Sequence, residues 1–353
     1  MPPVENEVNF LNLLERFLDF SLPNTYSAKS LAIELAKRTR LLDEVVREEL
    51  KFGAHSIQSF YKVFKEYLIA GLSEKDFADI YSQTITYGLF AARLRTNGDF
   101  NRKLAYDLIP KSIGILRDVF KFISLEDIPQ QMEIIIDDIS EVLNVADVKK
   151  ILEQYYREGK GSDPVLHFYE TFLAEYDPLT REKRGVYYTP EAVVSFIVKS
   201  VHQILKDKFK IYDGLASDKV TVLDPAGGTL GFIAKAIEVA IEHLIKSESQ
   251  GLIHLLIREH ILKNFYAFEL MMAPYAIGHM KISFLLEEQG YKMKDDERVK
   301  YYLTNTLDLK ELEESKLPGM SSLSSESHEA GKSKKRSSNF SDYWKSTIFR
   351  SFC

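Results

Sequence analysis

The stretch Lys219-Val-Thr-Val-Leu-Asp-Pro-Ala-Gly-Gly-Thr-Leu-Gly-Phe232 decides the fold class of this 353-residue chain. Its β-branched run at residues 220–223 predicts a buried strand. Gly227 and Gly228 then allow positive φ angles and let the backbone approach a ligand, because neither has a Cβ atom. The amphipathic run at residues 232–245 predicts a helix. A strand, a glycine turn and a helix in this order are typical of a doubly wound α/β domain, which binds nucleotide-like ligands at the carboxyl ends of its strands.

Two residues between the strand and the glycines indicate the kind of ligand. Pro225 stops the strand and stiffens the bend, because it lacks an N–H group and has a fixed φ angle. Asp224 places a carboxylate at the strand tip, where it can bind a cation or amide donors. A pyrophosphate site favours a helix N-terminus without a negative charge nearby. The acid therefore favours a cationic ligand such as S-adenosylmethionine, which carries a sulfonium and an amino group.

Further elements are predicted on both sides of the turn. Residues 264–269 form a second strand, and Glu269 at its tip is placed to accept hydrogen bonds from ribose hydroxyls. Pro274 opens a helix that runs to residue 286. Residues 299–303 form a third strand, followed by Asn305, whose amide can bind an adenine edge.

Upstream, the segment Arg184-Gly-Val-Tyr-Tyr-Thr-Pro190 precedes another helix. We expect Thr189 as its N-cap and Pro190 as its first helical residue. The apolar face of this helix consists of Val194, Ile197, Val198, Val201 and Leu205.

Taken in order, these segments resemble the motifs of adenine-N6 DNA methyltransferases, in particular those of the large single-chain type ISP and type IIG restriction–modification enzymes with an Eco57I-like methylase domain. Gly185-Val-Tyr-Tyr-Thr-Pro190 is similar to their upstream cofactor motif, and Asp224-Pro-Ala-Gly-Gly-Thr229 to their methionine-binding motif. Phe268-Glu-Leu-Met-Met-Ala-Pro-Tyr275 is similar to the ribose-acid motif, and Leu303-Thr-Asn-Thr-Leu307 to the adenine-ring segment. The resemblance extends upstream and covers most of the chain to about residue 330.

The resemblance implies the fold class α + α/β, in which an N-terminal helical domain precedes an incomplete Rossmann-like S-adenosylmethionine-dependent methyltransferase domain. It also implies S-adenosylmethionine as the cofactor and DNA as the partner of the intact enzyme. Leu230 departs from the wider pattern, because a third glycine is common at its position. No catalytic residue and no metal ligand are assigned in this chain. The residues assigned to cofactor binding are Tyr188, Thr189, Asp224, Pro225, Ala226, Gly228, Thr229, Glu269, Leu270 and Asn305.

In methyltransferases of this kind, an Asn/Asp-Pro-Pro-Tyr/Phe motif after the fourth strand binds the target amino group and stacks on the flipped-out adenine. That tetrapeptide does not occur in this sequence, which changes to a serine-rich run at residues 321–327 and a basic run at 332–336. Permitted codons for residues 336–352, read one base later, encode Glu-Val-Pro-Ile-Leu-Val-Ile-Ile-Gly-Asn-Pro-Pro-Tyr-Ser-Gly-His. We therefore expect a frameshift near Lys335 to truncate the enzyme before its catalytic motif and to leave it inactive.

We expect three regions along the chain. Residues 1–158 form a helical coupling domain, residues 159–330 the cofactor-binding part of the methyltransferase domain, and residues 331–353 a disordered, out-of-frame tail. Ser73 begins a capping box before a helix at residues 77–93, and Asp137 and Asp138 are interpreted as a solvated helix face. Three helical stripes mark the first region: Phe10, Leu13, Leu14, Phe17 and Leu18; Leu31, Ile33, Leu35, Leu41 and Leu42; Ile134, Ile135, Ile139, Val142 and Leu143.

Composition and net charge exclude several kinds of site and partner. A single cysteine allows neither a disulfide framework nor a zinc site. No leader and no apolar run of membrane-spanning length are present, so we expect a cytoplasmic protein without a membrane partner. The net charge of −6 is not that of a duplex-binding surface. We therefore expect DNA binding to be weak or absent in this fragment and to belong to the intact enzyme.

Two other functions stay open at this point. The first is a non-catalytic helical scaffold or cofactor-binding remnant, which the missing tetrapeptide favours. The second and weaker is a nicotinamide-dependent oxidoreductase. Against the second, the turn lacks Gly-x-Gly-x-x-Gly, and Glu269 follows Asp224 by 45 residues, whereas a ribose-binding acid in such enzymes follows by about 20.

Overall fold

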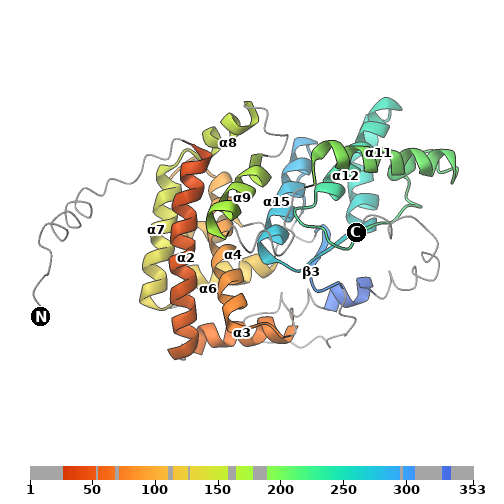
Figure 1. Ribbon diagram of the computed structural model, residues 1–353. Helices are drawn as coiled ribbons and strands as arrows, with labels where there is room; N and C mark the ends of the chain where they lie inside the picture. Colours follow the sequence, from red (N-terminus) through yellow and green to blue (C-terminus); the bar gives the residue numbers. More distant parts are fainter. Residues whose placement is uncertain are drawn as a thin grey trace, which may run out of the picture.

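The computed structural model describes residues 27–52, 55–67, 71–109, 114–125, 128–157, 164–177, 189–294, 297–306 and 328–334. In these residues a helical body precedes a smaller part that contains a parallel sheet (Figure 1). The helical body consists of α2 (Ala28–Phe52), α3 (His55–Tyr67), α4 (Glu74–Leu94), α5 (Arg102–Leu108), α6 (Gly114–Leu125), α7 (Gln130–Val145), α8 (Val148–Arg157) and α9 (Pro164–Tyr176).

The predicted helical stripes are confirmed only in part. On α2, Leu31, Leu35 and Leu42 are fully or almost fully buried, but Leu41 is 52% exposed. On α7, Ile134 is 62% exposed, although other members of its stripe are buried. Both errors have one cause: successive helical residues point about 100° apart, so neighbours in a run of apolar residues cannot all face the core. The stripe predicted at residues 10–18 lies outside the described residues.

The N-terminus of α4 has the cap expected from its sequence. The Ser73 hydroxyl accepts a hydrogen bond from the Asp76 N–H at 3.1 Å and donates to the Asp76 carboxylate at 2.6 Å. Further along α4, the Phe90 ring stacks on Phe168 of α9 with 4.3 Å between ring centroids. Helix α9 also packs against α2, so it joins the helical body, although it follows the predicted domain boundary at residue 158.

The two aspartates of α7 were predicted to form a solvated helix face, but each of them pairs with an arginine of another helix. Asp138 pairs with Arg38 of α2, with 2.7 Å between Oδ2 and Nε. Asp137 pairs with Arg102 of α5, with 2.9 Å between Oδ1 and Nε. Both arginines are at least 94% buried, and a buried guanidinium needs acceptors in the protein. The acids therefore anchor α2 and α5 to α7.

The sheet contains β1 (Val222–Asp224), β2 (Phe265–Glu269) and β3 (Lys300–Leu303), which are parallel and lie in that order. Asp224 is opposite Ala267, and Glu269 is opposite Leu303. The first strand was predicted at 220–223 but starts later, because the Val220 N–H is bonded to the Ser217 carbonyl in a turn. The elements around the strands are α11 (Glu191–Asp207), η1 (Gly214–Ala216), α12 (Gly231–Lys246), η2 (Gln250–Leu252), α13 (Ile253–Leu256), a π-helical turn η3 (Ile257–Ile261), α14 (Leu262–Asn264) and α15 (Met272–Glu288).

Two helix starts differ from prediction by one or two residues. Helix α11 begins at Glu191, with Pro190 rather than Thr189 as its N-cap, because the Pro190 carbonyl accepts the first helical hydrogen bonds. Helix α15 begins at Met272, two residues before Pro274. The order of strands and helices agrees with the α + α/β class.

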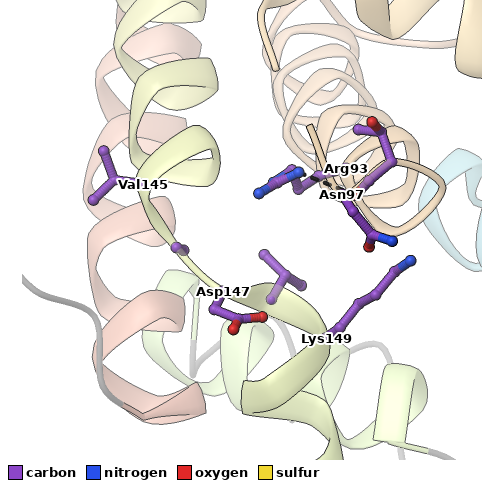
Figure 2. Close-up of a pocket in the computed structure, with 8 residues that line it drawn as sticks. Arg93, Asn97, Val145, Asp147 and Lys149 are labelled. Atoms are coloured by element: carbon purple, nitrogen blue, oxygen red, sulfur yellow. Dashed lines mark hydrogen bonds between the residues drawn. The ribbon is translucent and has the colours of Figure 1, made fainter. Parts of the chain in front are cut away.

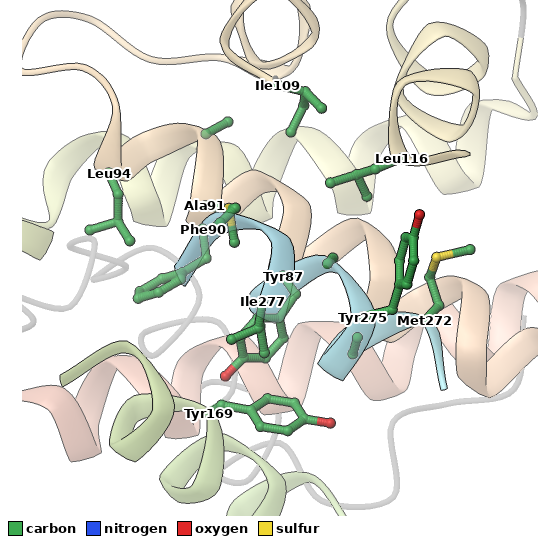
Figure 3. Close-up of a cluster of buried hydrophobic side chains, with 14 of the residues drawn as sticks. Tyr87, Phe90, Ala91, Leu94, Ile109, Leu116, Tyr169, Met272, Tyr275 and Ile277 are labelled. Atoms are coloured by element: carbon green, nitrogen blue, oxygen red, sulfur yellow. The ribbon is translucent and has the colours of Figure 1, made fainter. Parts of the chain in front are cut away.

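Helix α15 lies between the helical body and the sheet (Figure 1). Its Met272, Tyr275 and Ile277 belong to the same buried core as Tyr87 of α4 and Tyr169 of α9 (Figure 3). The opposite face of the sheet carries a second apolar cluster. This cluster consists of Tyr266, Phe268, Tyr302 and Ala330.

The second cluster is covered by residues 328–334, which are helical. Lys334 closes this contact: its Nζ donates to Thr304 Oγ1 at 2.8 Å and to the Asn305 carbonyl at 2.6 Å. The expectation of a disordered tail from residue 331 is thus wrong for residues 331–334, because Ala330 buries itself on the aromatic sheet face and Lys334 finds acceptors. The remainder of that tail lies outside the described residues.

No described helix is long and apolar enough to cross a membrane. Within the same residues, no group of three or more His, Cys, Asp or Glu side chains is placed to hold a metal ion.

Two histidines of the sheet-containing part have lowered pKa values, and we therefore expect the free energy of unfolding to fall at acidic pH. His279 of α15 is buried, with its Nε2 3.2 Å from the Tyr301 carbonyl oxygen, and burial lowers its pKa to about 3. Burial also lowers the pKa of the half-buried His202 to about 4. Below about pH 6.5 the unfolded chain therefore binds protons that the native chain does not. The free energy of unfolding has its full value above that pH and falls as the pH is lowered towards 4. His279 contributes up to about 1.4 kcal/mol per pH unit to this fall.

Chemical denaturation at pH 7, 6 and 5 measures this dependence. His279→Gln should flatten the loss of unfolding free energy relative to the wild type, while substitution of the exposed His254 by Gln should not. Equal slopes in the wild type and His279→Gln would contradict the assignment to His279.

Candidate functional site

The carboxyl ends of β1 and β2 bring together the two acids that the sequence singles out. Asp224 ends β1, and Glu269 ends the neighbouring strand β2. The glycine turn between Asp224 and α12 lies against both, since the Gly227 N–H donates to the Phe268 carbonyl at 2.8 Å. Parallel strands present their carboxyl ends at one edge of a sheet, where ligands of α/β domains bind.

One carboxylate oxygen of Asp224 is available to a ligand. Its Oδ1 accepts a hydrogen bond from the Ala226 N–H at 3.2 Å, while its buried Oδ2 has no hydrogen-bond partner among the described residues. Burial raises the pKa of this carboxyl, against the opposing effect of the Ala226 N–H. A sheltered carboxylate oxygen without a partner is costly to the fold. It is suited to a ligand that brings a donor or a positive charge.

Glu269 is already engaged by the backbone. Its Oε2 accepts from the Gly228 N–H at 2.9 Å, and its Oε1 accepts from the N–H groups of Leu270 at 2.8 Å and Met271 at 2.7 Å. Burial raises the pKa of this carboxyl, the three N–H groups oppose that rise, and the neighbouring Asp224 adds to it. The predicted ribose acceptor therefore also ties the glycine turn to the start of α15. A carboxylate has about four acceptor positions, which leaves about one for a ligand.

Two residues of the site were missed in the sequence. The Tyr301 hydroxyl donates to the Gly228 carbonyl, and the Thr306 hydroxyl donates to the Pro225 carbonyl at 2.6 Å. Gly228 thus has its N–H bonded to Glu269 and its carbonyl bonded to Tyr301. A signal for Tyr301 existed, because it is a tyrosine within the predicted third strand. That Tyr301 lies opposite Ala267 in the parallel sheet can be learned only from the fold.

Leu230 sits at the end of the turn in an unusual conformation. Its φ angle is +59°, in the left-handed region, and its side chain is fully buried. A non-glycine residue there costs about 1–3 kcal/mol, so surrounding contacts must hold it. The other described non-glycine residues with positive φ, Lys210 and Glu248, are exposed.

The remaining predicted site residues are placed as follows. Pro225 and Ala226 are exposed at the strand end, and Thr229 is half-buried in the turn. Leu270 is 43% exposed beside Glu269. Asn305 follows β3, where its carbonyl accepts from Lys334. Thr189 precedes α11 and, in the described part of the chain, makes no hydrogen bond to the turn; Tyr188 lies outside the described residues.

A separate cavity of about 420 Å³ lies in the helical body, between the end of α4 and the junction of α7 with α8 (Figure 2). Its residues are Arg93, Thr96, Asn97, Val145, Ala146, Asp147, Val148 and Lys149. Arg93 donates to the carbonyls of Leu143 and Thr96, at 2.8 Å and 3.1 Å. Its guanidinium thus holds the wall of the cavity together. None of the residues predicted for cofactor binding lines it.

Comparison with solved structures identifies the fold. A nuclease-deletion mutant of the type ISP restriction–modification enzyme LlaGI, in complex with a DNA substrate mimic, has a TM-score of 0.61 and 18% identity, over 94% of this chain and 25% of that one. The ATP-dependent type ISP enzyme LlaBIII bound to DNA has a TM-score of 0.59 and 19% identity, over 87% of this chain and 20% of that one. The DrdV–DNA complex has a TM-score of 0.58 and 18% identity, over 94% of this chain and 30% of that one.

Comparison of sequences adds a family. A putative ankyrin repeat protein, L484 of Acanthamoeba polyphaga mimivirus, is 27% identical over an alignment of 176 residues that covers 44% of this chain and 9% of that protein. The chain thus spans less than a third of the length of each of these similar proteins. Residues 160–314 match the family model for N-6 DNA methylase. Residues 160–314 are therefore similar to N-6 DNA methylases, and the fold is similar to that of type ISP restriction–modification enzymes.

Proposed function

We propose that the chain contributes the S-adenosylmethionine-binding half of a restriction–modification DNA methyltransferase that modifies adenine N6. The observation that supports this most is the buried Oδ2 of Asp224, which has no hydrogen-bond partner among the residues that the structure describes. It lies next to Glu269 at the carboxyl edge of the sheet. A ligand with a positive charge and hydroxyl donors would satisfy both acids. When bound, S-adenosylmethionine supplies the methyl group.

The chain's own residues would bind and orient that cofactor. Asp224 would accept from its cationic methionine end, and the remaining acceptor position of Glu269 would take a ribose hydroxyl. Leu270, exposed beside Glu269, and Asn305 would contact the adenine, in keeping with their places after β2 and β3. Tyr188, Thr189, Pro225, Ala226, Gly228 and Thr229 complete the proposed set.

DNA is proposed as the substrate of the complete enzyme. The three similar structures were solved with DNA or a DNA mimic. In this chain the Asn-Pro-Pro-Tyr tetrapeptide is missing and the net charge is −6, so we expect DNA affinity and base positioning to come from residues that this sequence does not contain. A cofactor-binding remnant without catalysis is the competing function, and the missing tetrapeptide favours it for the chain as printed.

Substitution of Asp224 tests the cofactor site. Asp224→Ala should weaken S-adenosylmethionine binding by about 1–3 kcal/mol, the cost of a lost hydrogen bond to a charged group. The same change should leave thermal stability equal or higher, because it removes a sheltered carboxylate whose Oδ2 has no partner within the described ranges. Isothermal titration calorimetry and thermal unfolding measure the two effects.

The exposed Asp218, which precedes β1 in the sequence, provides the matched control. Asp218→Ala should change neither affinity nor stability. Unchanged affinity in Asp224→Ala would place the cofactor elsewhere, and tight binding of NAD in place of S-adenosylmethionine would favour an oxidoreductase.

A further inference from the structure

The side chain of Leu230 fills a slot that two glycines leave open. A Cβ atom on Gly278 of α15 would lie 2.9 Å from Leu230 Cγ and 2.8 Å from Tyr301 Cε1. A Cβ atom on Gly227 would lie 3.0 Å from Leu230 Cδ2 and 3.1 Å from Ala267 Cβ. Leu230 is therefore packed against Gly227 of the turn and Gly278 of α15. A larger residue at Gly278 would displace Leu230, and one at Gly227 would press against it.

The backbone of Leu230 links this slot to the turn and to α12. Its N–H donates to the Gly227 carbonyl at 2.8 Å, and its own carbonyl accepts from the Ala234 N–H at 2.9 Å. The hydrogen bond that closes the glycine turn is thus made by Leu230, the residue whose side chain fills the slot. Gly228, which follows Gly227, is held on its two sides by Glu269 and Tyr301.

Tyr301 is itself fixed from α15. Its ring lies 5.0 Å from that of Tyr275 and 5.2 Å from that of His279, between centroids. Leu230 thus packs against a tyrosine that is itself fully buried and in contact with two rings of α15. A glycine in place of Leu230 would adopt the same φ angle without strain but would lose every contact of the side chain with this tyrosine.

We infer that Leu230 is a positioning residue of the cofactor site: its side chain, wedged against Gly278 and Tyr301, holds Gly227 and Gly228 where S-adenosylmethionine would contact the turn. The position of the turn depends on the wedge and not on the strained φ angle. This role rests on the proposed function, because the ligand that the turn would receive is the proposed cofactor.

Leu230→Ala, Leu230→Gly and Gly278→Ala test the wedge from both sides. Leu230→Ala removes the side chain but keeps the strained φ angle, Leu230→Gly removes both, and Gly278→Ala forces Leu230 out of its slot. All three should raise amide hydrogen exchange in a peptide spanning residues 224–231 at least tenfold and weaken S-adenosylmethionine binding at least tenfold. Gly231→Ala is the matched control, because a Cβ on Gly231 would meet no atom within 4 Å, and it should match the wild type in both measurements.

Amide hydrogen exchange and S-adenosylmethionine affinity together distinguish a failure of the positioning role of Leu230 from a failure of the proposed function. Wild-type exchange in Leu230→Ala, or wild-type affinity despite faster exchange, would overturn the positioning role. Faster exchange together with a wild-type chain that binds no S-adenosylmethionine would support the wedge and overturn the proposed cofactor. A large difference between Leu230→Ala and Leu230→Gly would assign the effect to backbone strain and overturn the wedge.

Discussion

The 353-residue chain is expected to transfer no methyl group from S-adenosylmethionine to DNA. Its sequence contains no Asn-Pro-Pro-Tyr or related tetrapeptide. Without that motif no residue is available to bind the target amino group and to stack on a flipped-out adenine. A gene read one base later from about the codon of Lys335, and continued in that frame, should encode an active enzyme, because the frame restores an apolar strand followed by the tetrapeptide.

Incorporation of labelled methyl groups into adenine-containing DNA measures this difference. The 353-residue chain should stay at background, whereas the frame-restored protein should be active. The frame-restored protein with Asp224→Ala provides the matched control, since it regains the motif but lacks the proposed cofactor contact. Incorporation by the 353-residue chain would contradict both the role of the missing motif and the proposed inactivity, and an inactive frame-restored protein would contradict the frameshift.

Local patterns in the sequence predicted the elements that form the site. The β-branched run before Asp224, the glycine turn and the helix after it lie within about 25 residues, and each has its own periodicity or breaker. The second strand and its acid were predicted in the same way, and β2 confirms them at Phe265–Glu269. Strand limits shifted by one or two residues, because hydrogen bonding with the neighbouring strand decides where a strand begins.

Contacts between distant residues could not be predicted from these patterns. Gly228 and Glu269 are 41 positions apart, and Tyr301 reaches Gly228 across 73 positions. Asp137 was interpreted as solvated because its partner Arg102 is on another helix. Leu230 was noted only as a departure from a glycine pattern, since the slot that receives its side chain is formed by α15 and β3. Each of these depends on packing that a single local window does not contain.

Loss of the Glu269 carboxylate should have the largest effect on the site itself. Glu269→Ala removes the common acceptor of three backbone N–H groups, those of Gly228, Leu270 and Met271. An unsatisfied buried donor costs about 1–3 kcal/mol, but the exposed surroundings of Leu270 allow water to replace part of the loss. We expect a destabilisation of about 2–3 kcal/mol together with loss of detectable S-adenosylmethionine binding, because the glycine turn is no longer tied to β2.

Glu269→Gln separates charge from hydrogen bonding at this position. Its amide keeps one acceptor oxygen, but its NH₂ group would face an N–H donor on the other side. It should therefore lose binding almost as severely as Glu269→Ala. Glu288→Ala, an exposed acid at the end of α15, should leave both thermal unfolding and calorimetric affinity unchanged.

The two acids of the site then differ in a way that identifies their roles. Asp224→Ala should lower affinity without lowering stability, because one oxygen of Asp224 has no hydrogen-bond partner in the described part of the chain. Glu269→Ala should lower both, because the protein uses both of its oxygens. A Glu269→Ala chain that melts and binds like the wild type would show that the turn is held without this carboxylate, and the site would then have to be assigned to other residues.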